Sequence, residues 1–481
     1  MSKATHTPWL ASWLVAVSLL FGLSLSTEIG RRASWPNGPL VTSGRWITDA
    51  SGTKLTYVGA NWPGSLETMI PEGLQYQSVE TIVSKIKSLG MNAVRLTYAI
   101  EMIDQYYDNG EQDITIQTAF IDALGQEDGT TIYNKVVANN PSFGNGTTRL
   151  QVYDAIAAEC AKQEIYVHLD NHVSKAGWCC SPLDGNSWWG DEYFDVGNWT
   201  RGLSFMAEHG KAWTGLVSMA LRNELRVPLS DTSLVSSYTW QDWYKYIQQG
   251  ANAIHSANSD VLIFLSGLDS DANLTAVAQG TALTPGTATF NRGDFDGYGD
   301  DKLVLELHVY DNILGPPTSS CATITEKWYN AGFQTLNSSA VNQFPLVVTE
   351  FGFPQNTSIN EDAYATCILD YFSSKNAGWM IWSLGGSYYI REGTEDYDEE
   401  WGLLSHDWSS WRSTDFITSF LSPAVKASTA PISDDDDSGD SSGDGSADES
   451  NSASVLSQNQ AGIIFTLGVV GVVVLRSYFW Q

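Results

Sequence analysis

Basic residues are scarce in this chain. Across 481 residues there are 25 Lys and Arg against 55 Asp and Glu, which gives a formal net charge of −30. Proteins that bind nucleic acid need cationic side chains to neutralise the phosphates. The charge balance therefore excludes nucleic acid as a partner, and it is typical of a soluble extracellular protein.

Cysteine is also scarce, and its spacing matches no zinc site. The five cysteines are Cys160, Cys179, Cys180, Cys321 and Cys367. In an oxidising compartment some of them should pair, and the odd count leaves at least one free or intermolecular. Because Cys179, Cys180 and Cys321 all lie in predicted loops, we expect one of the adjacent pair to bond Cys321. We expect no metal ion.

Long apolar runs are confined to the two ends of the chain. Near the N-terminus, Lys3 precedes the apolar run 9–25, and the small residues Ser24 and Ser26 lie at its end. This pattern predicts a secretory signal peptide over residues 1–26. An uncleaved membrane anchor is the alternative interpretation.

The C-terminal end combines an acidic spacer with an apolar tail. Residues 423–460 are rich in Asp, Ser and Gly, so they cannot bury enough apolar surface to fold and should be a disordered spacer. In the tail, 461–481, the apolar run is short for a membrane span, which needs about 20 residues. The small residues 451–453 before it match a lipid-anchor signal. Arg476 and the aromatic end fit a short membrane span instead, so both forms of membrane attachment stay open.

Five N-glycosylation sequons accompany the predicted signal peptide. They begin at Asn145, Asn198, Asn273, Asn337 and Asn356. A single sequon is a weak signal, but five behind a signal peptide indicate the secretory route. We therefore expect a secreted, extracellular protein that is tethered to the cell surface.

Between residues 35 and 422, short apolar runs alternate with amphipathic segments. Unbroken apolar runs are typical of strands buried on both faces of a parallel sheet. Eight such runs with helices between them predict a single α/β domain, a (β/α)8 TIM barrel, with a doubly wound open sheet as the alternative. The predicted strands are Lys54–Ala60, Asn92–Thr97, Ile165–Leu169, Leu216–Leu221, Val261–Ser266, Leu303–His308, Leu346–Thr349 and Trp379–Ser383. The predicted helices include Val79–Leu89, Leu150–Gln163, Trp240–Ala257 and Asn360–Lys375.

Two stretches between the predicted strands are longer than a barrel needs. They are Tyr98–Asn145 and His172–Gly197, and the second contains Trp178, Trp188 and Trp189. Long loops that follow barrel strands usually build the functional face. We therefore expect both to be loops at that face.

Two of the apolar runs end in a glutamate. Asn223-Glu224 ends the fourth predicted strand, and Glu350 ends the seventh and is followed by Phe351-Gly352. A carboxylate is costly to place at the end of a buried strand. A barrel brings the ends of strands four and seven to one pocket. Two carboxyl groups about 5 Å apart are what a retaining glycosidase needs.

Other predicted strands end in polar or aromatic side chains that point to the same pocket. Arg95 on strand two could donate to a carboxylate there. His308 and Tyr310 share one face of strand six because strand side chains alternate. The remaining candidates are His172 after strand three, Trp382 in strand eight, and Asn61 and Trp62 at the end of strand one.

Taken together, these segments resemble glycoside hydrolase family 5, the cellulase family. The resemblance covers roughly residues 35–422, and the segment 170–180 looks like a branch of the family found in plants and fungi. Eight characteristic positions of the family match Arg95, His172, Asn223, Glu224, His308, Tyr310, Glu350 and Trp382. Short motifs such as Asn-Glu are weak alone, but the ordered set is specific.

The resemblance implies a retaining mechanism that needs no cofactor. Glu350, ionised beside Arg95, would attack the anomeric carbon as the nucleophile. Glu224, with a raised pKa, would act as acid/base. Tyr310 would donate a hydrogen bond to the nucleophile.

The family pattern also implies roles in substrate binding. Asn223 would bind the sugar 2-hydroxyl, and His172 and His308 would position the substrate or the catalytic groups. Trp382 would form a stacking floor. Asn61 and Trp62 would be further subsite contacts.

The substrate class implied by the family is a β-linked polysaccharide. We expect a monomer that cleaves it as an endo-β-1,4-glucanase does. Hydrolysis of mannan or β-1,3-glucan on the same scaffold is an alternative, and so is cell-wall transglycosylation, in which a sugar acceptor replaces water. A catalytically inactive carbohydrate-binding wall protein is a third possibility, which the presence of both glutamates opposes.

Overall fold

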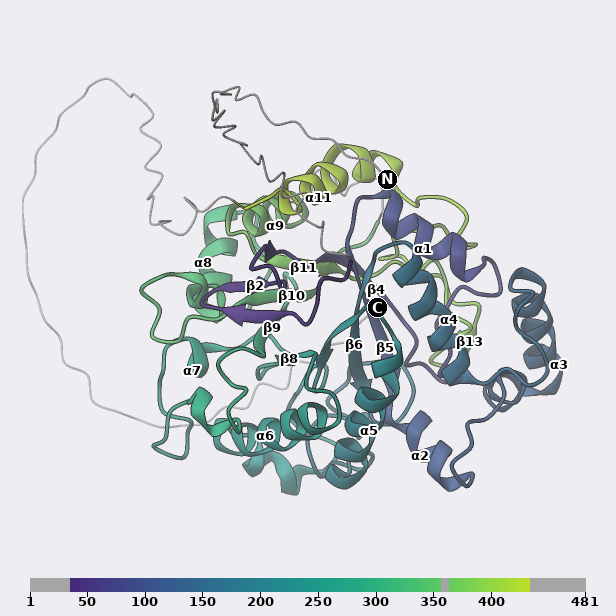
Figure 1. Cartoon of the computed structure of the whole chain (residues 1–481), viewed down its shortest axis with the longest axis horizontal. Coiled ribbons are helices and arrows are strands. Elements are labelled where there is room, and N and C mark those ends of the chain that lie inside the picture. The colour runs from purple at the N-terminus through teal and green to yellow at the C-terminus, as the bar shows by residue number, and fades with distance from the viewer. Residues whose placement is uncertain (1–34, 356–362, 433–481) are drawn as a thin grey trace, which may run out of the picture. The chain divides into compact units, whose positions relative to one another are not determined.

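A computed structural model of the chain describes residues 35–355 and 363–432 (Figure 1). The predicted signal peptide, the apolar tail, most of the acidic spacer and the sequon at Asn356 lie outside the described residues. Within the described ranges, no helix is long and apolar enough to cross a membrane.

Eight parallel strands close into a barrel, in which the last strand pairs with the first. Every residue of these strands is buried, which explains their unbroken apolar pattern. The predicted TIM barrel is therefore confirmed and the open sheet is excluded. The strands are β4 (Val58–Trp62), β5 (Ala93–Ala99), β6 (Tyr166–Val173), β7 (Leu216–Ala220), β8 (Leu262–Leu265), β9 (Leu303–Val309), β10 (Leu346–Phe351) and β11 (Gly378–Ile381).

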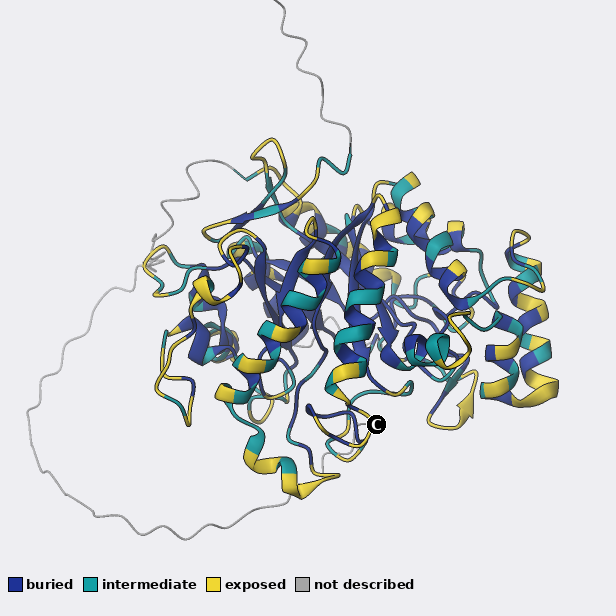
Figure 2. Ribbon diagram, turned by 60° about the horizontal axis from the view of Figure 1, so that its bottom comes forward, coloured by how far each residue is buried: buried dark blue, intermediate teal, exposed yellow. Residues whose placement is uncertain are grey.

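Helices surround the barrel, with exposed residues on their outer sides (Figure 2). Two of them begin after a residue whose side chain caps the helix. The Ser78 hydroxyl accepts the backbone N–H of Thr81, and the Thr239 hydroxyl accepts that of Asp242. The four predicted helices are present within a few residues of their expected bounds. The larger helices of this layer are α1 (Val79–Ser88), α4 (Arg149–Lys162), α5 (Val196–His209), α6 (Trp240–Ala257), α8 (Cys321–Ala331) and α9 (Ala363–Ser374).

The predicted loop 98–145 is wrong, because much of it is helical. It contains α2 (Ile100–Asp108) and α3 (Ile116–Asn139). Gly125 interrupts α3 with φ 81°, so the apolar residues on its two sides do not follow one helical period. That break hid the helix from the sequence pattern. The stretch 172–197, in contrast, is loop between the end of β6 at Val173 and the start of α5 at Val196.

A small antiparallel sheet closes the N-terminal end of the barrel. It consists of β1 (Val41–Ser43), β2 (Trp46–Thr48) and β3 (Lys54–Leu55). Leu40 and Ile47 pack in one apolar cluster with barrel residues such as Phe264. The predicted strand 54–60 is thus two strands in different sheets. With this end closed, the carboxyl ends of the barrel strands are left to form a site.

The domain continues past its predicted end at residue 422. Residues Ser422–Ser428 form α11, with Ala424 and Val425 buried, so they are not part of a disordered spacer. Pro423 lies in the first turn of this helix, where proline is tolerated because that N–H has no helical partner. Because α11 continues directly from the π-helical turn Ile417–Leu421, the change in composition at this proline lies inside a helical run and is not a domain boundary.

The cysteine pairing differs from the prediction. Cys179 bonds its neighbour Cys180, and Cys321 bonds Cys367. Cys160 is free and buried, as the odd count required. Cys321 does not lie in a loop but begins α8, which packs beside the helix α9 that carries Cys367. The sequence pattern contains no sign of that helix–helix contact.

Four of the predicted glycosylation sites fall within the described residues. Asn145 is exposed. Asn198, Asn273 and Asn337 are half-buried, and their side-chain amides donate to Asp104, Asp269 and the Tyr329 hydroxyl respectively.

Candidate active site

Arg95, on β5, is the centre of the polar cluster at the carboxyl ends of the strands. Its side chain is fully buried, and Nη1 donates to a Glu350 oxygen and, at 2.8 Å, to Asn61 Oδ1. Nη2 donates to Asn223 Oδ1 at 2.8 Å and lies 3.0 Å from an Asp170 oxygen. One guanidinium therefore contacts groups from four other segments. A planar donor with a fixed geometry suits this task.

Glu350 lies in β10, where the pairing with β9 shifts register between Val348 and Glu350. The shift places Glu350 opposite His308, and such irregularities often redirect a side chain near an active site. Tyr310 donates its hydroxyl to Glu350 Oε2 at 3.0 Å. With Arg95 on the other oxygen, both carboxyl oxygens accept a hydrogen bond.

The sequence predicted that Glu224 ends the fourth strand. In the structure Glu224 lies beyond the end of β7, in the chain that follows the strand. Its φ of 46° is left-handed, and its backbone N–H donates to Asp271 Oδ2 at 2.7 Å. His308 Nδ1 lies 3.0 Å from Glu224 Oε1. Burial raises the pKa of Glu224 to about 7, so the carboxyl can hold a proton near neutral pH. Burial also lowers the pKa of His308 to about 4, which keeps its imidazole neutral.

The two glutamates face one another across a short gap. A carboxyl oxygen of Glu224, one of Glu350 and a ring nitrogen of His308 all lie within 4.8 Å of one another. Inverting glycosidases need about 6.5–9.5 Å between their carboxyl groups to admit a water, whereas retaining enzymes need about 5 Å. The gap matches the retaining geometry.

His172 and Trp382 form an aromatic pair beside these carboxyls. Their rings stack at 5.5 Å between centroids, with 12° between the planes. Asp170 Oδ2 lies 2.7 Å from His172 Nδ1 and fixes the imidazole. Although burial opposes its charge, Arg95 and His172 lower the pKa of Asp170 to about 2. Trp382 follows β11 rather than lying within it, and it is 8% exposed.

Asn61 and Trp62, at the end of β4, are placed differently from the prediction. Both side chains are fully buried. Trp62 packs in the apolar core, and its indole N–H donates to the Glu72 carbonyl at 2.9 Å. Asn61 accepts from Arg95 and donates to the Thr349 carbonyl at 3.0 Å. Trp62 is therefore a core residue, and Asn61 positions Arg95 instead of contacting a substrate.

Sequence reasoning missed two residues that hold the site together. Asp271 is buried in the loop after β8. Its carboxyl accepts the backbone N–H of Glu224, and its backbone carbonyl accepts the backbone N–H of His308 at 2.9 Å. Asp170 orients His172 and pairs with Arg95. Asp170 lies in β6 directly after the predicted strand end at Leu169, so a search of the strand ends for acids would have found it. Asp271 lies in the loop beyond β8, where such a search does not reach. The bond between Cys179 and Cys180 had no such signal.

The cluster is poorly suited to a metal ion. Glu224, His308 and Glu350 offer ligand atoms close together. However, Arg95 and Tyr310 already donate to both oxygens of Glu350, and the guanidinium charge would repel a cation. Cys179 and Cys180 also lie near Glu224, but as a disulfide they carry no thiolate ligand.

The family model for cellulase (glycosyl hydrolase family 5) matches residues 48–387. The chain belongs to glycosyl hydrolase family 5. Family membership confirms the enzyme class expected from the sequence. Among curated proteins, a glycosyl hydrolase 5 family protein of Chamaecyparis obtusa is 36% identical over 391 residues, which cover 79% of this chain and 65% of that protein. The chain thus spans somewhat less than two thirds of that relative. An endoglucanase of Paenibacillus polymyxa is 24% identical over 436 residues, covering 86% of this chain and 95% of that protein.

Solved structures of the same fold include an endoglucanase and an endocellulase. The catalytic domain of the major endoglucanase of Xanthomonas campestris pv. campestris superposes with a TM-score of 0.58 at 19% identity, covering 80% of this chain and 99% of that one. An endocellulase of Pyrococcus horikoshii, in complex with cellotetraose, gives a TM-score of 0.60 at 19% identity, with coverages of 82% and 99%. At this identity the likeness establishes the shared barrel and no more.

Proposed function

We propose that this family 5 member is a retaining, endo-acting β-glucanase with Glu350 as nucleophile and Glu224 as acid/base. The observation that carries the proposal is the gap of at most 4.8 Å between their carboxyl oxygens. At that separation one carboxylate can attack the anomeric carbon while the other protonates the leaving oxygen. No room is left for the attacking water of an inverting enzyme.

In the first step, a Glu350 oxygen attacks the anomeric carbon and the bond to the glycosidic oxygen breaks. Glu224 donates its proton to that oxygen, for which a pKa of about 7 is well matched. Arg95 and Tyr310 hold Glu350 in the attacking orientation through one hydrogen bond to each oxygen. A covalent glycosyl-enzyme results.

In the second step, the now ionised Glu224 takes a proton from water, and the water oxygen attacks the anomeric carbon. The bond to Glu350 breaks, and the sugar leaves with retained configuration. His308, neutral and 3.0 Å from Glu224, keeps the acid/base in place through both steps. The Asp271 carboxyl holds the Glu224 backbone in its left-handed conformation.

The aromatic pair of His172 and Trp382 supports a sugar-binding role beside the glutamates. A large aromatic face presents apolar surface to the C–H face of a sugar ring. Relatives named as endoglucanases favour β-1,4-glucan as the substrate. Mannan and β-1,3-glucan would be cleaved by the same two carboxyls and differ only in the contacts around them.

We also propose that the protein is secreted and tethered at the cell surface. The predicted signal peptide and sequons support secretion, and one relative is a major extracellular endoglucanase of Xanthomonas campestris. The apolar tail supports the tether. Release of the surface protein by a phosphatidylinositol-specific phospholipase would identify a lipid anchor, whereas retention would favour a membrane span.

The catalytic proposal is tested on purified protein with carboxymethyl cellulose, mixed-linkage β-glucan, laminarin, mannan and xylan. Wild type should release reducing sugar from the β-1,4-glucans, and Glu224→Gln and Glu350→Gln should not. Glu127→Gln, an exposed glutamate on α3, is the matched control and should behave as wild type. Equal product release by all four proteins would refute the assignment, and products longer than the substrate would reveal transglycosylation.

A further inference from the structure

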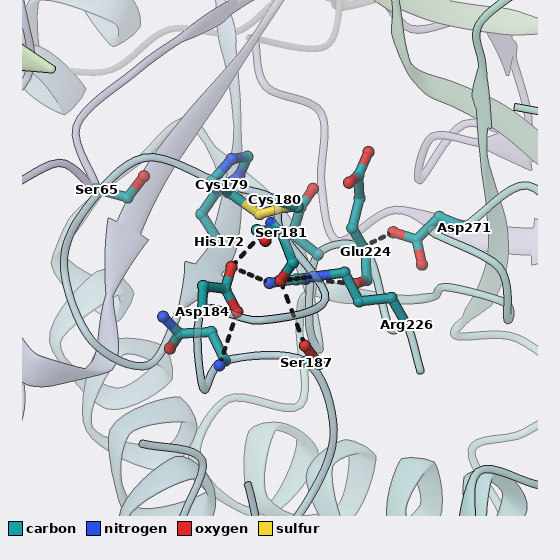
Figure 3. Close-up of a disulfide and its surroundings, with 12 residues drawn as sticks. Ser65, His172, Cys179, Cys180, Ser181, Asp184, Ser187, Glu224, Arg226 and Asp271 are labelled. Atoms are coloured by element: carbon teal, nitrogen blue, oxygen red, sulfur yellow. Dashed lines mark hydrogen bonds and ion pairs between the residues drawn. A yellow bond between two sulfur atoms is a disulfide. The ribbon is translucent and has the colours of Figure 1, made fainter. Parts of the chain in front are cut away.

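The loop after β6 carries an adjacent pair of bonded cysteines beside the proposed acid/base. Both sulfurs and a carboxyl oxygen of Glu224 lie within 4.8 Å of one another, and both cysteines are partly exposed. Figure 3 shows the disulfide between His172 and Glu224. It therefore borders the place where the scissile bond must lie.

Arg226 ties this loop to the backbone of Glu224. Its Nη1 donates to the Glu224 carbonyl at 2.7 Å, and its Nε donates to the Ser181 carbonyl at 2.9 Å (Figure 3). Its Nη2 also pairs with the Asp184 carboxylate. Because one guanidinium bonds both segments, the disulfide keeps a fixed position relative to the acid/base.

Asn223 provides a second link between the disulfide and the catalytic cluster. Its Oδ1 accepts from Arg95, so its Nδ2 faces the loop and lies 3.5 Å from each sulfur. The sulfurs act as weak acceptors and have no hydrogen to offer. The two bonded sulfurs thus face the side chain of Asn223, the residue that precedes Glu224.

Stabilisation of the fold does not explain this bond. A disulfide stabilises mainly by closing a loop of chain, and the effect grows with loop length. Cys179 and Cys180 are one residue apart and close almost no chain, whereas Cys321 and Cys367 are 46 apart. The loop is also held without the disulfide, because Asn186 Oδ1 accepts the N–H groups of Ser174 and Lys175.

We propose that the Cys179–Cys180 disulfide is a specificity-determining contact for the sugar at the scissile bond. The inference rests on the proposed function. A glycosidic oxygen that receives the Glu224 proton lies about 3 Å from that carboxyl, so a sugar ring attached to it reaches the two sulfurs. A disulfide is polarizable and lacks N–H and O–H groups, so it packs against the C–H face of the ring.

Protection from reduction tests the contact directly. The Glu224→Gln protein is treated with tris(2-carboxyethyl)phosphine. The phosphine reduces each disulfide to two thiols and becomes the phosphine oxide, with the oxygen atom and the two thiol protons supplied by water. The thiols are alkylated and counted by mass spectrometry, with and without cellohexaose. Bound cellohexaose should slow reduction of Cys179–Cys180 at least fivefold and leave Cys321–Cys367, the internal control, unchanged. Calorimetric binding of cellohexaose without such protection overturns the proposal.

Kinetics of two matched double variants provide the second test. Replacing Cys179 and Cys180 by serine should lower kcat/KM on cellohexaose about tenfold and leave the unfolding temperature unchanged. Replacing Cys321 and Cys367 by serine should lower the unfolding temperature and leave kcat/KM unchanged. The reverse pattern would make the adjacent disulfide a structural element and overturn the proposal. A wild-type protein that cleaves no glucan would instead refute the proposed function, on which this inference depends.

Discussion

The two ends of the barrel are built from the same strands but serve different purposes. At the N-terminal end, Val304 of β9 and Met380 of β11 pack in the apolar cluster under the small sheet. Toward the carboxyl end, β9 presents His308, and the chain after β11 presents Trp382, to the polar cluster. Along one strand the inward side chains change from apolar to polar.

The comparison shows how a closed barrel separates stability from chemistry. The apolar end buries surface from the N-terminal sheet and the strands, which favours folding. At the polar end, ion pairs and hydrogen bonds offset the desolvation cost of the buried charges, such as those of Arg95 with Asp170 and Glu350. Conserving the fold and changing the chemistry are therefore separable in a barrel.

Removing Arg95 should break this separation most strongly. Arg95→Met leaves the buried carboxyls of Asp170 and Glu350 without their cation, so we expect about 3–5 kcal/mol of lost stability. Activity should be lost as well, because Glu350, the proposed nucleophile, loses the donor to one of its carboxyl oxygens. Denaturant unfolding and kcat/KM measure the two effects. Arg95→Lys, which keeps the charge but not the fork of donors, should recover more stability than activity. A fully active Arg95→Met protein would contradict the proposed role.

A large apolar residue at the other end should affect stability alone. Phe264 of β8 is fully buried, 5.9 Å from the Tyr57 ring and 4.3 Å from the His168 ring between centroids. Phe264→Ala should cost about 3–5 kcal/mol in the free energy of unfolding. The kcat of the folded fraction should stay within about twofold. Phe264→Leu should cost less, and a large fall in kcat would show that the two ends are coupled.

Asp271 should affect chemistry more than stability. Asp271→Ala removes the acceptor of the Glu224 backbone N–H. The proposed acid/base then loses its backbone anchor, and we expect kcat to fall about 10- to 100-fold. Asp271→Asn keeps an acceptor oxygen and should recover most of the activity. Asp269→Asn, in the same left-handed loop but exposed, is the control. Equal losses in the Ala and Asn variants would argue against positioning through this hydrogen bond.

The pH dependence should show the smallest effect. In the proposed mechanism Glu224 acts as an acid while it is protonated, and burial raises its pKa to about 7. As pH rises through 7, the carboxyl ionises, so kcat/KM for cello-oligosaccharides should fall about tenfold per pH unit above that point. An aryl cellobioside with an acidic phenol needs no protonation, so its glycosylation step should lack this decline. A decline centred near pH 4.5 for oligosaccharides would contradict the raised pKa.

Much of the site was predictable because parallel strands all end at one edge of a barrel. Arg95, His308, Tyr310 and Glu350 could be assigned to that edge from strand positions alone. Asp271 could not, because it lies beyond the end of β8 in a loop and is the last of three successive left-handed residues, 269–271. Trp62 was assigned to a subsite because its position was right, but its side chain packs into the core.

The sequence by itself determined the barrel, the family and the chemical identity of the two carboxyls, because these depend on local periodicity and on the order of motifs. The tertiary structure decided how those residues act on one another. Arg95 and Glu350 are 255 residues apart in the chain yet share an ion pair. The raised pKa of Glu224 and the short separation of the two carboxyls both come from such long-range contacts. Burial and distance set each of them, and local sequence specifies neither.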